Sequence, residues 1–290
     1  MAAPIFDRHS FLRYTVPIEQ AKFLILPVPY EQTTSYGTGT KKGPDAIIKA
    51  SQYLELFDEE LALEPYLEGI HTLEPIAFDK GPSERSIEKI YETVKALPLQ
   101  NKFLVSFGGE HSITYPILRA FEEQVPRMSV LQIDAHSDLR DAYEGTIYSH
   151  GSVMARIKDM VDIVQAGIRS QSKEEYDFIK KMGIRTFYMH MIRSDHLWKE
   201  HVVDALGNTV YLTIDLDGFD PSVAPAVGTP EPGGLSWYDV IDLIKMIIKK
   251  RHLVGCDIVE LAPEPHSITT DFLAAKLAYK IMGNLIASRS

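Results

Sequence analysis

Three short segments of the sequence combine histidine and carboxylate side chains at close spacing. Residues 108–112 read Gly-Gly-Glu-His-Ser, residues 134–138 read Asp-Ala-His-Ser-Asp, and residues 215–221 read Asp-Leu-Asp-Gly-Phe-Asp-Pro. The Asp-x-His-x-Asp spacing places three side chains on the same side of an extended backbone. Buried carboxylates that lie side by side cannot all stay ionised unless a positive charge compensates them. These residue types therefore indicate a site that binds cations.

The number of donors indicates two metal ions rather than one. Four carboxylates and two imidazoles exceed the ligand set of a tetrahedral zinc site, and none of the three segments contains a cysteine. Carboxylate oxygens suit hard cations such as Mn²⁺, and two such ions bridged by shared carboxylates would use all of these donors. Taken singly, each side chain could instead cap a helix or close a turn. The candidate ligands are His111, Asp134, His136, Asp138, Asp215 and Asp217.

Each of the three segments follows a short apolar run that predicts a β-strand. Eight such runs occur, and most are continuous rather than alternating, which is typical of strands buried on both faces of a parallel sheet. Helical patterns separate them, so we expect an α/β fold with a central, mostly parallel eight-stranded sheet and helices on both faces. In such sheets, ligands bind at the carboxyl ends of the strands, where the three segments lie. The runs are 23–28, 70–78, 103–107, 129–133, 163–167, 184–188, 210–214 and 253–259.

Composition and charge exclude several classes of protein. The chain has 290 residues, is 45% hydrophobic and carries a net charge of −10, so we expect neither general disorder nor binding to nucleic acid or anionic membranes. No apolar run is long enough to span a membrane, and the single cysteine, Cys256, cannot form an intrachain disulfide. Because no repeat or linker interrupts the pattern, we expect one domain over residues 1–290 in a soluble, cytoplasmic protein.

The sequence resembles the ureohydrolases, the family of the arginases and agmatinases. The family signatures look like Gly-Gly-(Asp/Glu)-His-Ser, Asp-Ala-His-x-Asp and Asp-x-Asp-x-x-Asp-Pro, and all three stand here in the family's order. The resemblance extends from about Pro27 to the last predicted helix. It implies an arginase-like three-layer sandwich, two Mn²⁺ ions per subunit and a homotrimer or homohexamer.

The resemblance also implies how the candidate ligands divide between the two ions. Asp134 and Asp215 would bridge them, and a hydroxide between the ions would attack the guanidinium carbon. Two metals suit this reaction because guanidinium is a resonance-stabilised, poor electrophile and water is a weak nucleophile at neutral pH. One ion would be held by His111, Asp134, Asp138 and Asp215, and the other by His136, Asp134, Asp215 and Asp217.

The resemblance implies three catalytic residues. Asp138 would hold and relay the proton of the attacking water, and His150 aligns with the family's proton-shuttling histidine that contacts the substrate. Glu260 matches the family's guanidinium-binding glutamate, whose carboxylate can form two parallel charge-assisted hydrogen bonds. Structural alternatives are a histidine that caps or packs a helix start and a glutamate that pairs with a surface lysine.

The loops around the predicted site favour a substrate with a cationic tail. Residues 139–148 lack the Ser-Gly-Asn element with which arginases bind the α-carboxylate, whereas 29–44 and 228–235 resemble the agmatinase branch. We expect Asp141, Glu144 and Glu231 to bind an ammonium tail, and Arg140 could neutralise Asp141 or bind an acid. The favoured reaction converts agmatine to putrescine and urea in polyamine biosynthesis. The alternative converts N1-aminopropylagmatine to spermidine and urea.

Three further hypotheses use the same residues differently. Another guanidino-acid ureohydrolase would need a cation for a carboxylate, and Arg140 is the visible candidate. A deacetylase-like amidohydrolase with a single zinc ion is disfavoured by the presence of both His111 and His136 together with Glu260. A non-catalytic protein that binds polyamines is disfavoured because every expected ligand is present.

Overall fold

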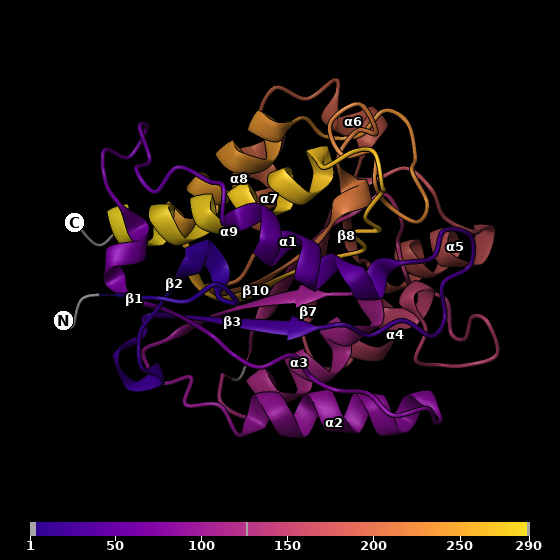
Figure 1. Ribbon diagram of the computed structural model, residues 1–290. Helices are drawn as coiled ribbons and strands as arrows, with labels where there is room; N and C mark the ends of the chain where they lie inside the picture. The colour runs from indigo at the N-terminus through magenta and orange to yellow at the C-terminus, as the bar shows by residue number, and fades with distance from the viewer. Residues whose placement is uncertain (1–3, 126, 289–290) are drawn as a thin grey trace.

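The central element of the computed structural model, which describes residues 4–125 and 127–288, is an eight-stranded sheet (Figure 1). Neighbouring strands pair in parallel throughout this sheet, in the order β4-β3-β5-β10-β9-β6-β7-β8. The continuous apolar runs become strands because both faces of the sheet are covered. The strands are β3 (Phe23–Val28), β4 (Ile70–Thr72), β5 (Phe103–Gly108), β6 (Ser129–Ile133), β7 (Asp162–Ile168), β8 (Arg185–Tyr188), β9 (Thr209–Asp215) and β10 (His252–Val259).

Helices cover the two faces of the sheet and form separate hydrophobic cores. Alternate residues of β3 enter different cores: Phe23 and Ile25 pack on one side, and Leu24 and Leu26 on the other. In Figure 1, α2 and α3 lie below the strands, and α1, α8 and α9 lie above them. One face carries α2 (Ser83–Lys95), α3 (Thr114–Glu122), α4 (Val153–Ile157) and α5 (Lys173–Met182), and the other carries α1 (Gly43–Ser51), α6 (Met189–Ile192), α7 (Trp198–Ala205), α8 (Trp237–Lys250) and α9 (Thr269–Ala287).

This architecture confirms the predicted fold class and all eight predicted strands. The run 70–78 is a strand over its first three residues only, Ile70–Thr72, because β4 is an edge strand that pairs with β3 alone. Helix α1 follows a 3-10 turn, Thr40–Lys42, and begins at Gly43 with Pro44 in its first turn, a position that proline tolerates. Among residues 4–125 and 127–288, no helix has the length and apolar character needed to cross a membrane.

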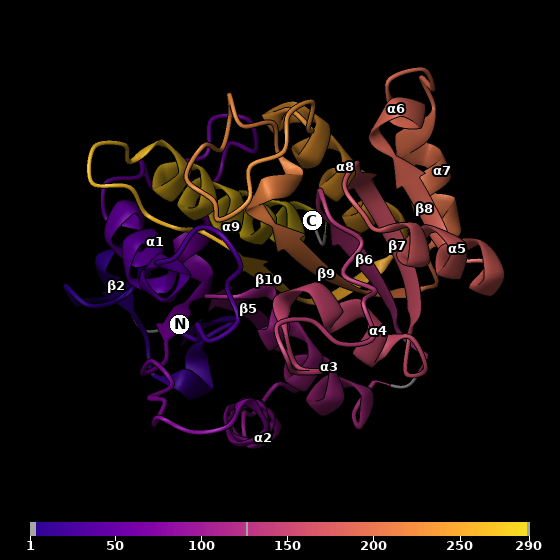
Figure 2. The same ribbon diagram turned by 90° about the vertical axis from the view of Figure 1, so that its right-hand side faces the viewer.

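The strand order brings the sequence motifs to one place. Strands β5, β10, β9 and β6 are neighbours in the middle of the sheet, and all four point the same way (Figure 2). Strands β5 and β6 are consecutive along the chain but are separated in the sheet by β10 and β9. The connections after these strands therefore diverge, which creates a crevice at their carboxyl ends.

Candidate metal centre

The backbone at the strand ends directs the candidate ligands into this crevice. His111 begins a short 3-10 turn, His111–Ile113, separated from the end of β5 by two residues, and Asp215 ends β9. The turn after β5 needs a glycine, because a Cβ atom at Gly109 would lie 1.9 Å from the carbonyl oxygen of Tyr30. Asp138 has a φ angle of +53°, a left-handed conformation that is uncommon for a residue with a side chain and is often found at functional sites.

One imidazole nitrogen faces three carboxylates. Nδ1 of His111 lies 3.1 Å from Oδ2 of Asp134 and 3.0 Å from Oδ2 of Asp138. The Oδ2 atom of Asp215 is 3.4 Å from the same nitrogen, and all of these side chains are buried. One N–H proton cannot satisfy three carboxylates, and Nδ1 makes no well-aligned hydrogen bond within the described part of the chain. A metal ion in place of that proton would be bound by all four side chains.

The second histidine lies against a different pair of carboxylates. Nδ1 of His136 is 2.9 Å from Oδ2 of Asp217 and 3.7 Å from Oδ1 of Asp134. Asp134 therefore directs one carboxylate oxygen toward each histidine. Its position is fixed by the side-chain amide of Gln132, which donates to Oδ2 at 2.7 Å.

Burial and mutual repulsion oppose ionisation of the clustered carboxyl groups. Burial, and then the charge of Asp134, raise the pKa of Asp138 from 3.8 to about 7. Burial, followed by repulsion from Asp217 and Asp134, raises the pKa of Asp215 well above its ordinary value. For His136, burial lowers the pKa but the neighbouring carboxylates outweigh it, and the pKa rises to about 12. The cluster has more carboxylates than its two imidazoles can balance, which is the electrostatic condition of a cation site.

The donors form two groups, each compact enough to hold one ion. Within each group the donor atoms lie within 4.8 Å of one another, and Asp134 belongs to both. Asp138 approaches the first group through His111. The Oδ1 atom of Asp215 accepts the backbone N–H of Asp217 at 2.9 Å. The two groups are His111, Asp134 and Asp215, and Asp134, His136 and Asp217. All six candidate ligands are thus brought together, with oxygen and imidazole donors that fit two hard cations.

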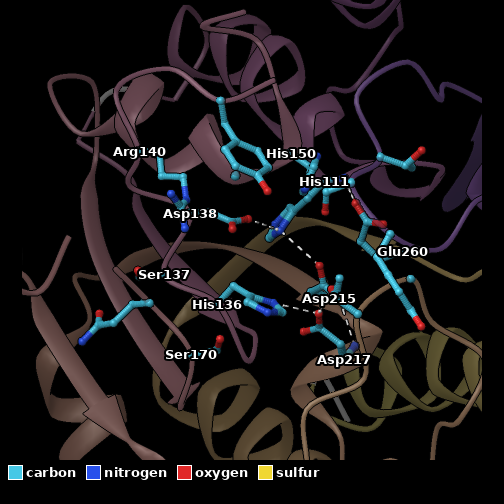
Figure 3. A pocket seen from close by; sticks show the side chains of 18 of the residues that line it. His111, His136, Ser137, Asp138, Arg140, His150, Ser170, Asp215, Asp217 and Glu260 are labelled. Carbon is cyan, nitrogen blue, oxygen red and sulfur yellow. Dashed lines mark hydrogen bonds and ion pairs between the residues drawn. The ribbon is translucent and has the colours of Figure 1, made fainter. Parts of the chain in front are cut away.

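Glu260 and His150 lie on the wall of the same cavity, which has a volume of about 260 Å³ (Figure 3). Glu260 directly follows β10 with a φ angle of +65°, and its Oε1 atom accepts the backbone N–H of His111 at 2.7 Å. Burial, followed by repulsion from Glu110, raises the pKa of Glu260 well above its ordinary value. A cationic group in the cavity would relieve this repulsion and pair with the carboxylate.

The three acids predicted to bind a substrate tail are not gathered in the cavity as the candidate metal ligands are. The side chain of Asp141 is fully exposed and pairs with Arg156 at 3.0 Å, because its loop turns outward. Glu144 is also exposed, at a left-handed turn with φ of +50°. Glu231 lies closer to the candidate ligands, with its Oε1 atom 3.9 Å from Nε2 of His136. Arg140 lines the cavity, and its guanidinium lies over the ring of Tyr143.

Several residues in or behind the cavity wall could not be assigned to the site from the sequence alone. Glu175 lines the cavity, although its local pattern is that of a helix cap: it completes the capping box of α5 with Ser172. Tyr36 and Thr229 reach the cavity from the segments 29–44 and 228–235, whose resemblance to the agmatinase branch singled out neither residue. Glu110, inside the first motif, is completely buried behind the wall.

The comparisons with known proteins agree with this geometry. The model of the arginase family matches residues 21–283. The chain is 38% identical over 271 residues to the N(1)-aminopropylagmatine ureohydrolase of Synechocystis sp., covering 91% of this chain and 89% of that protein. It is 32% identical over 281 residues to the agmatinase of Bacillus cereus, covering 94% of each.

Solved structures give the same result for the fold. The agmatine ureohydrolase of Thermoplasma volcanium superposes with a TM-score of 0.87 at 31% identity, covering 99% of this chain and 96% of that one. The proclavaminate amidino hydrolase of Streptomyces clavuligerus superposes with a TM-score of 0.88 at 26% identity, covering 99% and 98%. The chain belongs to the arginase family, as its motifs and its parallel sheet indicate.

Proposed function

We propose that this protein is a manganese-dependent ureohydrolase that releases urea from a guanidino compound with an amine tail. The observation that carries the proposal is the convergence of three carboxylates on Nδ1 of His111, at the base of a cavity that Glu260 also lines. Agmatine, which would give putrescine and urea, is the first candidate substrate.

N1-aminopropylagmatine, which would give spermidine and urea, is the second candidate. The specific observation in its favour is that three relatives named N(1)-aminopropylagmatine ureohydrolase are 38% identical to the chain, against 32% for the agmatinase of Bacillus cereus. Both substrates carry an ammonium group that Glu231, 3.9 Å from Nε2 of His136, could attract. Glu175 also lines the cavity, but it is buried and has Arg140 beside it at 3.8 Å. Asp141 and Glu144 would act only through their longer-range charge.

The residues of the cavity supply binding and proton transfer. When bound, two Mn²⁺ ions would supply the missing positive charge and activate water as the nucleophile. Glu260 would pair with the guanidinium and orient its carbon toward the metal ligands. Asp138 would accept the proton of the attacking water. His150 would take up this proton, relayed from Asp138, at its unprotonated ring nitrogen and pass it to the leaving amine, which departs as a neutral group only when it is protonated.

The proposed function also implies a domain organisation, a location, a pathway and an assembly for the protein. We infer a single ureohydrolase domain over residues 1–290, a cytoplasmic location, a place in polyamine biosynthesis, and assembly as a homotrimer or homohexamer. The resemblance to the arginase family supports these inferences. Light scattering should give about three or six times the chain mass of 32.7 kDa, and the mass of a monomer would contradict the assembly.

Comparative urea release tests the function. The Mn²⁺-loaded protein is incubated with agmatine, N1-aminopropylagmatine and arginine, and urea is measured alongside metal content. We expect urea from one or both amine-tailed substrates, little from arginine, and two Mn²⁺ per chain. One tightly bound zinc per chain would support a deacetylase-like site instead, and no urea from any guanidino compound would overturn the proposal.

A further inference from the structure

A buried carboxylate behind the cavity wall accepts hydrogen bonds from four donors. Glu110 is fully buried, and its Oε1 atom accepts the backbone N–H groups of Gln32 and Thr33. Its Oε2 atom accepts the hydroxyl of Thr33 at 2.6 Å and that of Ser112 at 3.3 Å. The two backbone N–H groups can only donate, so Oε1 is an acceptor, and a carboxylate, which has no proton, accepts at Oε2 as well.

The hydroxyl of Thr33 connects this carboxylate to His150. Its oxygen lies 3.2 Å from Nδ1 of the His150 ring and also accepts the backbone N–H of His150 at 3.2 Å. A hydroxyl has one proton and two lone pairs. Since the proton of Thr33 is donated to Glu110, its oxygen can only accept from the ring. Nδ1 of His150 must therefore carry a proton, and Nε2 is left with a lone pair.

The orientation of the ring is fixed on a second side. The ring of Tyr143 meets His150 edge to face, with centroids 5.5 Å apart and an interplanar angle of 81°. Both rings line the same cavity as five of the six candidate ligands, all except Asp134 (Figure 3). A neutral imidazole has one donor and one acceptor nitrogen, and the hydrogen bond of the first nitrogen decides which role the second has.

We propose that Thr33, held by Glu110, is a positioning residue that fixes His150 in the Nδ1–H tautomer and leaves Nε2 to exchange the proton of the reaction. The inference rests on the proposed role of His150 in proton transfer. It adds a residue from the loop after β3, 117 positions from His150, that acts without touching the ions or the reacting atoms.

Kinetics of matched variants test the positioning role. Thr33→Val removes the hydroxyl at nearly constant volume, and we expect kcat to fall roughly tenfold to a hundredfold, within the range of general acid–base catalysis, while KM and manganese content stay unchanged. Thr33→Ser restores the hydroxyl and should recover most of kcat. Thr40→Val is the control, since Thr40 is a buried threonine of the same segment whose hydroxyl bonds to Glu31. Equal kcat values for Thr33→Val and the wild type would overturn the proposal.

Neutron diffraction of the manganese-loaded crystal reads the tautomer directly and does not depend on activity. We expect a deuteron on Nδ1 of His150 and the Thr33 deuteron directed at Glu110; a deuteron on Nε2 alone would overturn the proposal. In Glu110→Gln the new amide can donate to Thr33, which frees the Thr33 hydroxyl to donate to Nδ1, so we expect the tautomer to reverse. If the wild type releases no urea from any guanidino compound, the proposed function fails, whereas the tautomer is still decided by the deuteron.

Discussion

Nε2 of His111 lies 2.8 Å from the hydroxyl oxygen of Thr213, on the side of the ring away from the carboxylate cluster. The hydroxyl of Thr213 in turn donates to Oδ1 of the buried Asp257 at 2.5 Å. Because that proton is used, Thr213 accepts from Nε2–H, so loss of the Nδ1 proton, rather than of this one, gives the lone pair that a metal ion needs. Asp257 also accepts the hydroxyls of Tyr211 and Thr114, so the acceptor itself is held in place.

Removal of the Thr213 hydroxyl should weaken metal binding. In Thr213→Val, His111 loses the partner that fixes its tautomer and orientation. We expect the affinity for Mn²⁺ at the His111 site to fall about 10–100-fold, the usual cost of losing such an outer partner. Equilibrium dialysis with Mn²⁺ measures this. Thr213→Ser keeps the hydroxyl and should bind nearly as the wild type does; equal weakening in both variants would show that packing rather than the hydroxyl is responsible.

Substitution of Asp134 should affect both ions at once. Asp134 belongs to both donor groups and directs one oxygen to each histidine. We therefore expect Asp134→Ala to lose affinity for two Mn²⁺ ions per chain, whereas Asp217→Ala should chiefly affect the ion beside His136. Metal analysis after gel filtration measures the stoichiometry. An Asp134→Ala protein that retains two Mn²⁺ per chain would contradict the shared position.

Loss of the His150 imidazole should lower turnover and leave the metal content near normal. His150 lines the cavity, and its ring bonds to Thr33 rather than to a carboxylate of the cluster. If His150 transfers the proton as proposed, kcat of His150→Ala should fall about 100-fold or more, the range of general acid–base catalysis. Steady-state urea release together with metal analysis checks this. Loss of both ions in this variant would show a structural role instead.

Glu260→Gln should weaken binding of the guanidinium. The substitution keeps the size of the side chain and an acceptor for the backbone N–H of His111, but removes the charge that we propose pairs with the substrate. We expect kcat/KM to fall by about tenfold or more, with most of the change in KM, because a charge-assisted bond contributes roughly 1.5–3 kcal/mol. Glu264→Gln, an exposed residue shortly after β10, is the matched control. Equal kcat/KM in the two variants would exclude a role for the Glu260 charge.

The strands and the cluster of candidate metal ligands follow from local signals in the sequence, whereas the positions of the acids proposed to bind the substrate tail do not. A buried strand can be identified from its own apolar residues, and parallel pairing brings the carboxyl ends of the strands together. The direction of Asp141 and the inward position of Glu175 depend instead on how a loop leaves β6 and how α5 begins. The contact of Thr33 with His150 joins segments whose pairing leaves no local pattern. Such long-range contacts between loops are visible only in the folded chain.

Metal removal should make stability depend on pH in a definite direction. Burial and repulsion raise the pKa of Asp138 from 3.8 to about 7 in the folded apoprotein. Between these values the folded chain holds a proton that the unfolded chain has released, so the free energy of unfolding of the apoprotein falls as the pH rises through that window. Bound Mn²⁺ replaces the proton, so the gain in Tm on adding Mn²⁺ to EDTA-treated protein should widen from pH 5 to pH 7, about the upper end of the window. Thermal scans with and without Mn²⁺ measure the gain; a gain independent of pH, or an equally steep apoprotein curve in Asp138→Asn, would contradict this origin.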